Sequence, residues 1–482
     1  MKLNLDRLPA AVHTARKAIT ACGGEPTLVG GAVIDLLAGR TPKDFDIEVF
    51  GLSLETIEGK FSSAKSVGNS FGIVVVNIDG VDLDLSVPRV DNKVGKGHSG
   101  FEVLMDPSMS KREAARRRDF TINTLAVNLA TGELIDEWGG LDDLRAGVLR
   151  ATDPVLFRQD PLRVWRAVQL LARKAKTVDP ATFNLLRDMV PDTADLPPER
   201  LWEELKKLML KAARPSDGLQ LASDLGLWRF MAPEINALNG TGQSPTWHPE
   251  GDVWTHSLLA ADAAAELRPS LPEEDQLVIM LAAFLHDIGK PLTTITPEMV
   301  EADEAPADML WTAHGHDIKG MAPADTFLQR FTGPKGHKAI RTKVSRLVGE
   351  HMQPWNLTAG EAKQGAWARL NRRLNADGVT LHHLASVCQC DACATSKDWR
   401  SRSLASGAPN WEHKSSERVL HWAEHFDNLP DEPKVQGRHL IARGMKPGRQ
   451  FGSILATCRD LQDANPAWGV DELLDAALAP QS

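Results

Sequence analysis

The sequence contains no tyrosine and few cysteines, and each shortage excludes a kind of chemistry. None of its 482 residues is a tyrosine, which excludes any reaction that needs a phenol side chain. Its five cysteines, at positions 22, 388, 390, 393 and 458, are too few and too irregularly spaced for a disulfide framework in a chain of this length. We therefore expect free thiols.

An excess of positive charge and long apolar runs are also missing. With 55 Lys+Arg against 64 Asp+Glu the net charge is −9, so a nucleic acid would have to be bound by local basic patches. The first 21 residues mix charged and short apolar pieces, unlike a signal peptide, and no later apolar run approaches about 18 residues. We expect a soluble, cytoplasmic protein with no membrane partner and no obligate protein partner.

The order of sequence patterns indicates several domains. At about 150 residues per domain, the length suggests roughly three. Residues 26–150 alternate β-branched runs, glycine-bounded turns and short helical stretches, whereas 153–238 show helical spacing of apolar residues. A linker rich in Gly, Ser, Thr and Pro follows at 239–249, then a helical segment rich in histidine to about 353, then further helices broken by Gly and Pro at 428–452.

A glycine turn opens the first chemical pattern. Residues 27–37, TLVGGAVIDLL, predict a strand, a turn at Gly30 and Gly31, and the start of a helix. Such a turn would aim free backbone N–H groups at an anion such as a phosphate. A plain tight turn is the simpler alternative for this segment alone.

Two acidic strands follow the turn. Residues 44–50, DFDIEVF, predict a strand whose period of two places Asp44 and Asp46 on one face. Residues 81–87, VDLDLSV, alternate in the same way, so a neighbouring strand would supply a third carboxylate, Asp84. Carboxylates this close repel one another unless a cation lies between them, which predicts Mg²⁺. Two acidic faces turned toward solvent are the alternative.

Two further motifs complete a family resemblance. Residues 116–126 read RRRDFTINTLA and residues 158–167 read RQDPLRVWRA; together with residues 28–51 they resemble the class II tRNA nucleotidyltransferases, the CCA-adding enzymes and bacterial poly(A) polymerases. Three ordered motifs over about 140 residues are a specific signal. The resemblance implies an α+β fold, in which a small mixed-sheet palm domain at 1–150 precedes a helical neck at 151–240.

The resemblance also implies the chemistry and the residues that perform it. A 3′-hydroxyl attacks the α-phosphate of a nucleoside triphosphate with two metal ions and no protein nucleophile. By resemblance, Asp160 and Arg163 select CTP and ATP through their base edges, and Arg166 lies one helical turn on. The candidate residues are Asp44, Asp46 and Asp84 for catalysis, the first two holding Mg²⁺, and Gly30, Gly31, Arg118, Asp119, Asn123, Asp160, Arg163 and Arg166 for the nucleotide.

Simpler alternatives exist for these motifs, and two positions depart from the family pattern. The basic run fits a solvated helix face, and Asp160 with Arg163 fits a surface ion pair three residues apart. Ile34 stands where the family usually has Arg, which removes a cationic contact to the triphosphate. Gln159 stands where the family usually has Glu, which removes a charge that would orient Arg163.

Spaced histidines form a second pattern. An apolar helix over 277–285 is followed by adjacent His and Asp, and further histidines come before and after it. This order resembles the HD superfamily of metal-dependent phosphohydrolases, which hydrolyse phosphomonoesters or 2′,3′-cyclic phosphates with metal-activated water. On that pattern a domain at 245–400 binds a divalent transition metal through His256, His286, Asp287 and Asp391, with His316 and His351 as the optional pair for a second metal.

The C-terminal third carries weaker signals. Cys388, Cys390 and Cys393 lack a second paired half for zinc, so thiols on a helix are the favoured interpretation. Basic residues gather at 157–176 and 434–449, and residues 437–448, GRHLIARGMKPG, resemble a C-terminal motif of the same nucleotidyltransferases. We expect a helical tail at 401–482 that contacts RNA by shape and charge.

Three functional hypotheses follow. The leading one is a template-independent nucleotidyltransferase that adds or repairs the 3′ CCA end of tRNA from CTP and ATP, with a second, HD phosphohydrolase activity. A poly(A)-adding relative shares every motif and would ignore CTP. An HD phosphohydrolase with a degenerate, nucleotide- or RNA-binding N-terminal domain is favoured by Ile34 and Gln159. A non-enzymatic scaffold leaves the carboxylates and histidines unexplained.

Overall fold

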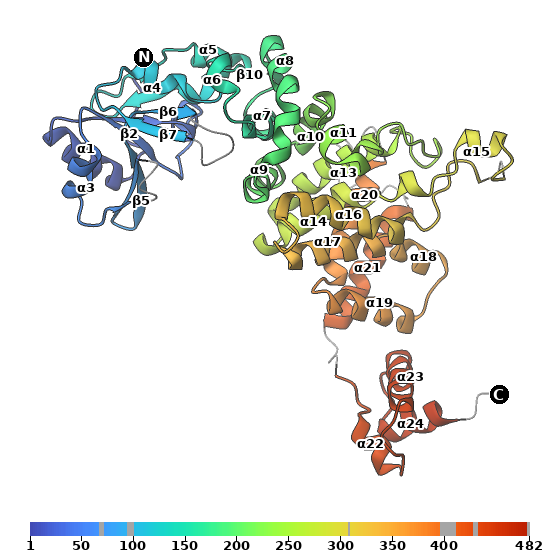
Figure 1. Cartoon of the computed structure of the whole chain (residues 1–482). Helices are drawn as coiled ribbons and strands as arrows, with labels where there is room; N and C mark the ends of the chain where they lie inside the picture. Colours follow the sequence, from blue (N-terminus) through green and yellow to red (C-terminus); the bar gives the residue numbers. More distant parts are fainter. Residues whose placement is uncertain (67–71, 94–100, 307–308, 396–410, 428–431, 480–482) are drawn as a thin grey trace. The chain divides into compact units, whose positions relative to one another are not determined.

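The computed structural model describes residues 1–66, 72–93, 101–306, 309–395, 411–427 and 432–479, and they form two compact units (Figure 1). The first comprises Met1–Arg200 with Leu221–Phe230, and the second comprises Leu201–Gln220 with Met231–Ser482. The boundary runs through the expected neck, and the division into four domains stays a prediction. Part of the expected tail, residues 401–410, 428–431 and 480–482, lies outside the described residues.

A mixed sheet of seven strands forms the N-terminal part of the first unit, in the order β3-β4-β5-β2-β1-β8-β9. Strands β2 and β5 run parallel, and the other neighbours run antiparallel. This confirms the expected α+β class with a mixed-sheet head. The sheet strands are β1 (Glu25–Val29), β2 (Asp46–Phe50), β3 (Lys65–Ser66), β4 (Ile73–Ile78), β5 (Val81–Ser86), β8 (Ala126–Asn128) and β9 (Leu134–Ile135); β6 (Arg89–Lys93) pairs with β7 (Phe101–Met105), and β10 (Val148–Leu149) with β11 (Thr177–Val178).

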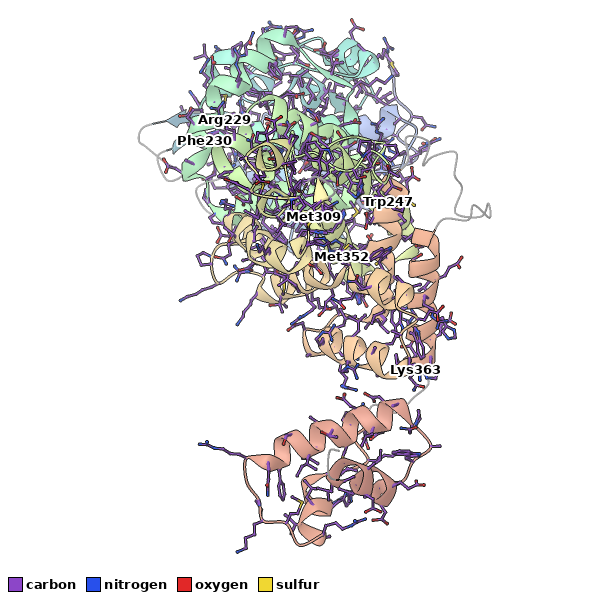
Figure 2. The ribbon with its side chains drawn as sticks, turned by 90° about the vertical axis from the view of Figure 1, so that its right-hand side faces the viewer. Arg229, Phe230, Trp247, Met309, Met352 and Lys363 are labelled. Carbon is purple, nitrogen blue, oxygen red and sulfur yellow. The ribbon has the colours of Figure 1, made fainter. Side chains whose placement is uncertain are left out.

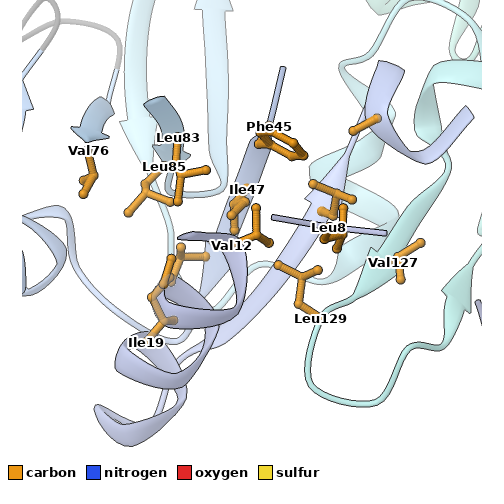
Figure 3. Packing of buried hydrophobic residues seen from close by; sticks show 14 of the residues in the cluster. Leu8, Val12, Ile19, Phe45, Ile47, Val76, Leu83, Leu85, Val127 and Leu129 are labelled. Atoms are coloured by element: carbon orange, nitrogen blue, oxygen red, sulfur yellow. The ribbon is translucent and has the colours of Figure 1, made fainter. Parts of the chain in front are cut away.

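The alternation of apolar and acidic residues decides which face of the sheet is buried. Ile47 on β2 and Leu83 and Leu85 on β5 are fully buried, and α1 (Ala10–Ala21) packs Val12 and Ile19 into the same core (Figure 3). The residues between them on β2 and β5 therefore lie on the opposite face. The sheet thus presents its acidic side chains away from the core.

Short helices surround the sheet, and longer ones follow it. Helix α7 repeats apolar residues every three or four positions; Val164, Trp165 and Val168 are buried, which leaves Arg163 and Arg166 partly exposed. The chain passes between the two units within α9, α10 and α11. These helices are α2 (Gly31–Leu37), α3 (Leu54–Lys60), α4 (Lys111–Arg116), η1 (Thr121–Thr124), α5 (Gly140–Ala146), α6 (Pro154–Phe157), α7 (Leu162–Lys174), α8 (Pro180–Met189), η2 (Val190–Asp195), α9 (Pro198–Lys211), α10 (Pro215–Asp224) and α11 (Leu227–Met231).

The second unit is helical in its described residues. Helices α13, α14, α16, α17 and α20 pack on one another around apolar side chains, and α22 to α24 enclose a separate small core that includes Leu440 and Leu473. Its elements are α12 (Pro233–Asn236), α13 (Val253–Leu267), η3 (Arg268–Ser270), α14 (Glu273–Leu285), η4 (Lys290–Leu292), α15 (Pro297–Glu301), α16 (His316–Thr332), α17 (Lys338–Glu350), α18 (Gln353–Ala359), α19 (Gln364–Ala376), α20 (Leu381–Ala394), α21 (Trp411–Asp427), α22 (Gly437–Ala442), α23 (Gln450–Ala464) and α24 (Val470–Leu478).

One helical segment passes a test for membrane-spanning length and mean hydropathy, although its uninterrupted apolar run covers only residues 277–285. Among the described residues, Glu273–Glu301 contains an 18-residue window with a mean hydropathy of 1.3, enough by length and composition to cross a membrane. The window is 72% buried inside the protein, and it includes much of α14. A buried core helix passes the same test, so this segment is weak support for a membrane span.

Candidate active sites

The glycine turn lies directly against one of the predicted aspartates. Gly30 precedes α2 with φ 71° and ψ −139°, a conformation that residues with a Cβ atom avoid. A Cβ atom on Gly30 would stand 3.5 Å from Asp46 Oδ2, whereas one on Gly31 would meet nothing within 4 Å. The turn therefore forms one wall beside the Asp46 carboxylate.

Two of the predicted carboxylates are direct neighbours in the sheet. Asp46 and Asp84 are register partners on the parallel strands β2 and β5, and Asp44 comes two residues before Asp46. Burial and the charges of Asp84 and Asp44 raise the pKa of Asp46, although Arg118 opposes them. Burial, Asp82 and Asp44 likewise raise the pKa of Asp84.

This arrangement fits a divalent cation. Crowded carboxylates hold their protons more tightly because their charges repel, and a cation bound among them removes that repulsion. Three carboxylates offer the hard oxygen ligands that Mg²⁺ prefers. Asp44, Asp46 and Asp84 are exposed, as the alternative of two acidic faces turned toward solvent also expects.

A buried glutamate holds the predicted arginine. Glu48, 2% exposed, forms ion pairs with Arg117 at 3.1 Å and with Arg118 at 3.2 Å. The side chain of Arg118 also donates to the carbonyl oxygen of Asn123 at 3.4 Å. Sequence reasoning gave Glu48 no function. Its place on the acidic face of the strand, two residues after Asp46, is the signal that could have found it.

The structure brings Asp119, Asn123 and Arg166 together. Asp119 is 6% exposed, and it accepts hydrogen bonds from the amide of Asn123 at 2.9 Å and from Arg166 Nε at 2.7 Å. Burial alone would raise the pKa of Asp119, but Arg166 and Asn123 hold it below its ordinary value. Asp119 therefore ties the second motif to α7.

The structure does not pair Asp160 with Arg163. Asp160 instead accepts from Arg200 Nη2 at 3.0 Å. Arg163 donates to the carbonyl oxygens of Leu156 at 3.2 Å and Arg117 at 2.6 Å. The ion pair considered as an alternative from their spacing is thus replaced by contacts that hold Arg163 in place.

The two departures from the family pattern have different surroundings. Ile34 is buried on α2, with 3% exposed, so it contributes to packing where an arginine was expected. Gln159 is half-buried, directly before Asp160.

Four histidines of the second unit face one another in pairs. His256 lies in the first turn of α13, His286 and His351 follow the last residues of α14 and α17, and His316 is the first residue of α16. The two Nε2 atoms are 3.1 Å apart in the pair His256–His286 and 3.2 Å apart in the pair His316–His351. All four residues are buried.

Their outward-facing ring nitrogens are already engaged. Nδ1 of His286, His316 and His351 lies 2.7–2.8 Å from the carbonyl oxygen three residues earlier in the chain. Nδ1 of His256 lies 2.7 Å from Glu250 Oε1. When these imidazoles are neutral, Nδ1 donates its hydrogen bond to the carbonyl or carboxylate oxygen, so each Nε2 presents a lone pair. Two lone pairs facing each other at about 3 Å call for a cation between them, so the residues present fit a metal.

Asp287 joins the two pairs. Its Oδ2 lies 3.3 Å from His286 Nε2, and its Oδ1 lies 3.1 Å from His316 Nε2. Asp391, on α20, completes the first group, with its Oδ1 3.0 Å from His256 Nε2. The structure thus brings together all six residues of the HD prediction in two adjoining groups that share one carboxylate.

The charges of this cluster are strongly coupled. Burial alone would raise the pKa of Asp287, but Lys290 and His286 hold it well below its ordinary value. Burial opposes the charged form of His286 too, yet Asp287 and Asp391 raise its pKa to about 10. Burial and the neighbouring His316 and His286 lower the pKa of His351 to about 3.

Sequence reasoning missed the residues behind the metal ligands. Glu250, 8% exposed, accepts from His256 and also from His248 Nδ1 at 2.8 Å. Lys290 Nζ lies 2.7 Å from Asp287 Oδ2 and 2.6 Å from Gln243 Oε1. The nearness of His248 and Glu250 to His256 in the sequence was a signal, whereas nothing in the sequence links Gln243 to Lys290.

The ligands of the first group differ in their exposure to solvent. The Asp391 side chain is 30% exposed, unlike those of His256 and His286, which are fully buried. Trp247, directly before His248, is 55% exposed on the same unit (Figure 2). Within this group of ligands, Asp391 is therefore the one most exposed to solvent.

Two weaker predictions have mixed outcomes. Cys388, Cys390 and Cys393 lie on α20 as free thiols, as expected. In the C-terminal basic stripe, Lys434 donates to the carbonyl oxygens of Pro466 and Trp468, and Arg443 pairs with Asp471 and Asp475. The exposed residues Lys446 and Arg449 remain as candidate phosphate contacts.

Family models match most of this architecture. The Poly A polymerase head domain matches residues 27–150, the probable RNA and SrmB-binding site of polymerase A matches 177–238, and the HD domain matches 253–395. The carboxylate pair falls within the first match and the histidine cluster within the third. These matches define the class: a nucleotidyltransferase of the poly(A) polymerase and CCA-adding type with an HD phosphohydrolase domain.

Similarity along the chain identifies the family within that class. The multifunctional CCA protein of Xanthomonas campestris pv. campestris (strain B100) is 35% identical over 442 residues, which cover 90% of this chain and 96% of the relative. That of Neisseria meningitidis (serogroup C, strain FAM18) is 35% identical over 454 residues, covering 90% and 98%. The chain belongs to the class II CCA-adding family, among the multifunctional CCA proteins, which confirms the resemblance found in its motifs.

Solved structures share the fold. The Bacillus stearothermophilus CCA-adding enzyme in complex with CTP is 20% identical, with a TM-score of 0.62 over 96% of this chain and 94% of that chain. The Thermotoga maritima CCA-adding enzyme complexed with tRNA is 18% identical, with a TM-score of 0.57 over 98% and 95%. A CCA-adding enzyme in complex with ATP is 19% identical, with a TM-score of 0.62 over 98% and 95%.

Proposed function

We propose that this protein adds or repairs the 3′ CCA end of tRNA from CTP and ATP. The observation that carries the proposal is the adjacent placement of Asp46 and Asp84 on parallel strands, beside the Gly30 turn and Arg118. The solved relatives named as complexes with tRNA, CTP and ATP support the choice of substrates.

In this proposal Asp44, Asp46 and Asp84 hold Mg²⁺. When bound, the ions lower the pKa of the attacking 3′-hydroxyl and neutralise charge on the leaving pyrophosphate. Arg118, fixed by Glu48, lies where its charge acts on Asp46, and we assign it to the triphosphate. A guanidinium suits that task because its planar N–H groups match phosphate oxygens in pairs.

We assign the selection of the nucleotide to residues on α7 and directly before it. We assign base recognition to Asp160 and Arg163, as the resemblance implies, and a supporting role to Arg166 through Asp119. Arg163 is held by two carbonyl oxygens, which fixes its orientation before a base arrives. Asp160 is 30% exposed and pairs with Arg200, so reading a base edge requires that it exchange this partner for the nucleotide.

The histidine cluster supports a second activity, hydrolysis of phosphate esters. His256, His286, Asp287 and Asp391 would hold one divalent transition metal ion, and Asp287, His316 and His351 a second. Such ions supply a water molecule activated for attack on phosphorus. Lys290 keeps Asp287 ionised, and Glu250 fixes the ring of His256, so both prepare the site for the metal.

We also assign Lys446 and Arg449 to phosphate contacts with tRNA. Each neutralised phosphate releases counterions, so replacing both with Ala should weaken tRNA binding and flatten its dependence on salt concentration. The expected cytoplasmic location stays a prediction.

The experiment for the proposed function is extension of a tRNA transcript that lacks its 3′ CCA, with Mg²⁺, CTP and ATP. The wild type should add three nucleotides, and the Asp44→Ala, Asp46→Ala variant should add none. An Asp142→Ala variant is the matched control, because Asp142 is an exposed aspartate on α5 of the same unit and pairs with Arg145. Tailing with ATP alone would support a poly(A)-adding enzyme, and no addition by the wild type would contradict the proposal.

A further inference from the structure

Glu48 carries a buried carboxylate that has no direct role in the proposed reaction. It lies on β2 two residues after Asp46, so both side chains are on the same face of the strand. Its side chain is only 3% exposed. An unpaired buried carboxylate costs several kcal/mol, so the partners of Glu48 define what it does.

Each carboxylate oxygen of Glu48 takes a different arginine. Oε1 pairs with Arg117 Nη2 at 3.1 Å, and Oε2 pairs with Arg118 Nη2 at 3.2 Å. Both arginines follow α4, about 70 residues further along the chain. One carboxylate thus fixes two neighbouring guanidinium groups against the strand that carries Asp46.

Hydrogen bonds also connect these two arginines to α7 and to η1. The carbonyl oxygen of Arg117 accepts from Arg163 Nη2 at 2.6 Å, and Arg118 Nη1 donates to the carbonyl oxygen of Asn123 at 3.4 Å. Among the described residues, Arg117 Nε is buried and has no hydrogen-bond partner. A buried donor without a partner is costly, and an oxygen of a bound ligand would satisfy it.

We propose that Glu48 is a positioning residue for the nucleotide, holding Arg117 and Arg118 against β2 so that their remaining N–H groups meet the triphosphate of CTP or ATP. The inference deepens the proposed function and rests on it for the identity of the nucleotide.

The test replaces Glu48 with the amide of the same shape. Glu48→Gln removes the charge that holds both arginines, and charge-assisted hydrogen bonds of this kind correspond to about tenfold or more in binding. We expect KM for CTP and for ATP to rise by about tenfold, with KM for tRNA unchanged. Calorimetric titration of the protein with CTP, without tRNA, should show the same loss of affinity independently of CCA addition.

A matched control separates positioning from general loss of a buried charge. Glu204 is 3% exposed and pairs with Lys207 at 2.9 Å, so Glu204→Gln makes the same change at a buried glutamate outside the proposed site. It should leave both nucleotide KM values unchanged. A Glu48→Gln variant that binds CTP like the wild type and only melts at a lower temperature would overturn the proposal.

A double-variant comparison tests whether Glu48 acts through its arginines. If it does, the variant with both Glu48→Gln and Arg118→Lys should bind CTP about as weakly as Arg118→Lys alone. If the losses of CTP affinity in the two single variants multiply in the double variant, the proposal is overturned. If Glu48→Gln does not fold, Arg117→Lys and Arg118→Lys must each weaken CTP binding, and failure of either variant to do so overturns the proposal. A wild type that binds CTP but adds no CCA contradicts only the proposed function.

Discussion

At the scale of single residues, the Gly30 turn makes the most direct stability prediction. Its φ of 71° and ψ of −139° are strained for any residue with a Cβ atom, so Gly30→Ala should lower the free energy of unfolding by about 1–3 kcal/mol. CCA addition should fall as well, because the turn borders Asp46. Urea denaturation and the extension assay measure the two effects.

Gly31 provides the comparison for that variant. It is the first residue of α2, and a Cβ atom there would meet nothing within 4 Å. Gly31→Ala should therefore be close to neutral or slightly stabilising, since Ala favours a helix over Gly. Equal destabilisation by the two substitutions would show that backbone conformation at Gly30 is not what matters.

Asp119 predicts how stability depends on pH. Its pKa in the folded protein lies below the ordinary 3.8, so the carboxylate stabilises the fold above pH 3.8 and loses that effect as the pH falls through the folded-state pKa. Asp119→Asn should cost about 2 kcal/mol at pH 6. The difference from the wild type should shrink below pH 3.8, as followed by urea unfolding at several pH values; a difference that stays constant would contradict this account.

At the scale of elements, the turn after α14 fixes where His316 lies. A Cβ atom on Gly289 would stand 2.0 Å from the carbonyl oxygen of His316 and 2.7 Å from the amide nitrogen of Gly320, so Gly289→Ala must push this turn away from α16. We expect the variant to lose the metal ion at His316 and His351 before the one at His256 and His286. Metal analysis after equilibration with Mn²⁺ measures the stoichiometry.

His314 is the control for that variant. It is exposed and lies two residues before His316, in the loop that leads into α16. His314→Ala should retain the wild-type metal content. If Gly289→Ala lost metal equally from both groups of ligands, the two groups would not have separate roles.

The elements that sequence predicted well are those with a strong period. The alternation in residues 44–50 and 81–87 gave both acidic strands and the face that carries Asp46 and Asp84, because one side of the sheet must be buried. The helical spacing of apolar residues in 153–238 likewise predicted helices there, of which α7, Leu162–Lys174, is one. The glycine turn was predictable because few residues other than glycine adopt its φ.

The partners of the site residues could not be predicted in the same way. Periodicity tells which face a side chain occupies, but not which distant element covers that face. Glu48 meets arginines about 70 residues away, and Asp160 meets Arg200 rather than the nearby Arg163. Asp391 reaches His256 across 135 residues of sequence, and the family order of ligands was what suggested it.

At the scale of the whole molecule, the two sites belong to different compact units, so the two activities should be separable. The Asp44→Ala, Asp46→Ala variant should lose CCA addition and keep hydrolysis of a nucleoside 2′,3′-cyclic phosphate. His256→Ala with Asp287→Ala should lose hydrolysis and bound transition metal and keep CCA addition. Loss of both activities in either variant, with the fold intact by circular dichroism, would contradict independent sites.

The central claim is that Asp44, Asp46 and Asp84 catalyse the addition of a CCA end to tRNA. The sequence of the added nucleotides tests this claim most directly. A tRNA transcript ending before CCA is incubated with the wild-type protein, Mg²⁺, CTP and ATP, and its 3′ end is then sequenced. The account predicts the addition of C, C and A followed by a stop, and no addition by the Asp44→Ala, Asp46→Ala variant. A run of adenosines, or an unchanged 3′ end with the wild type, would contradict it.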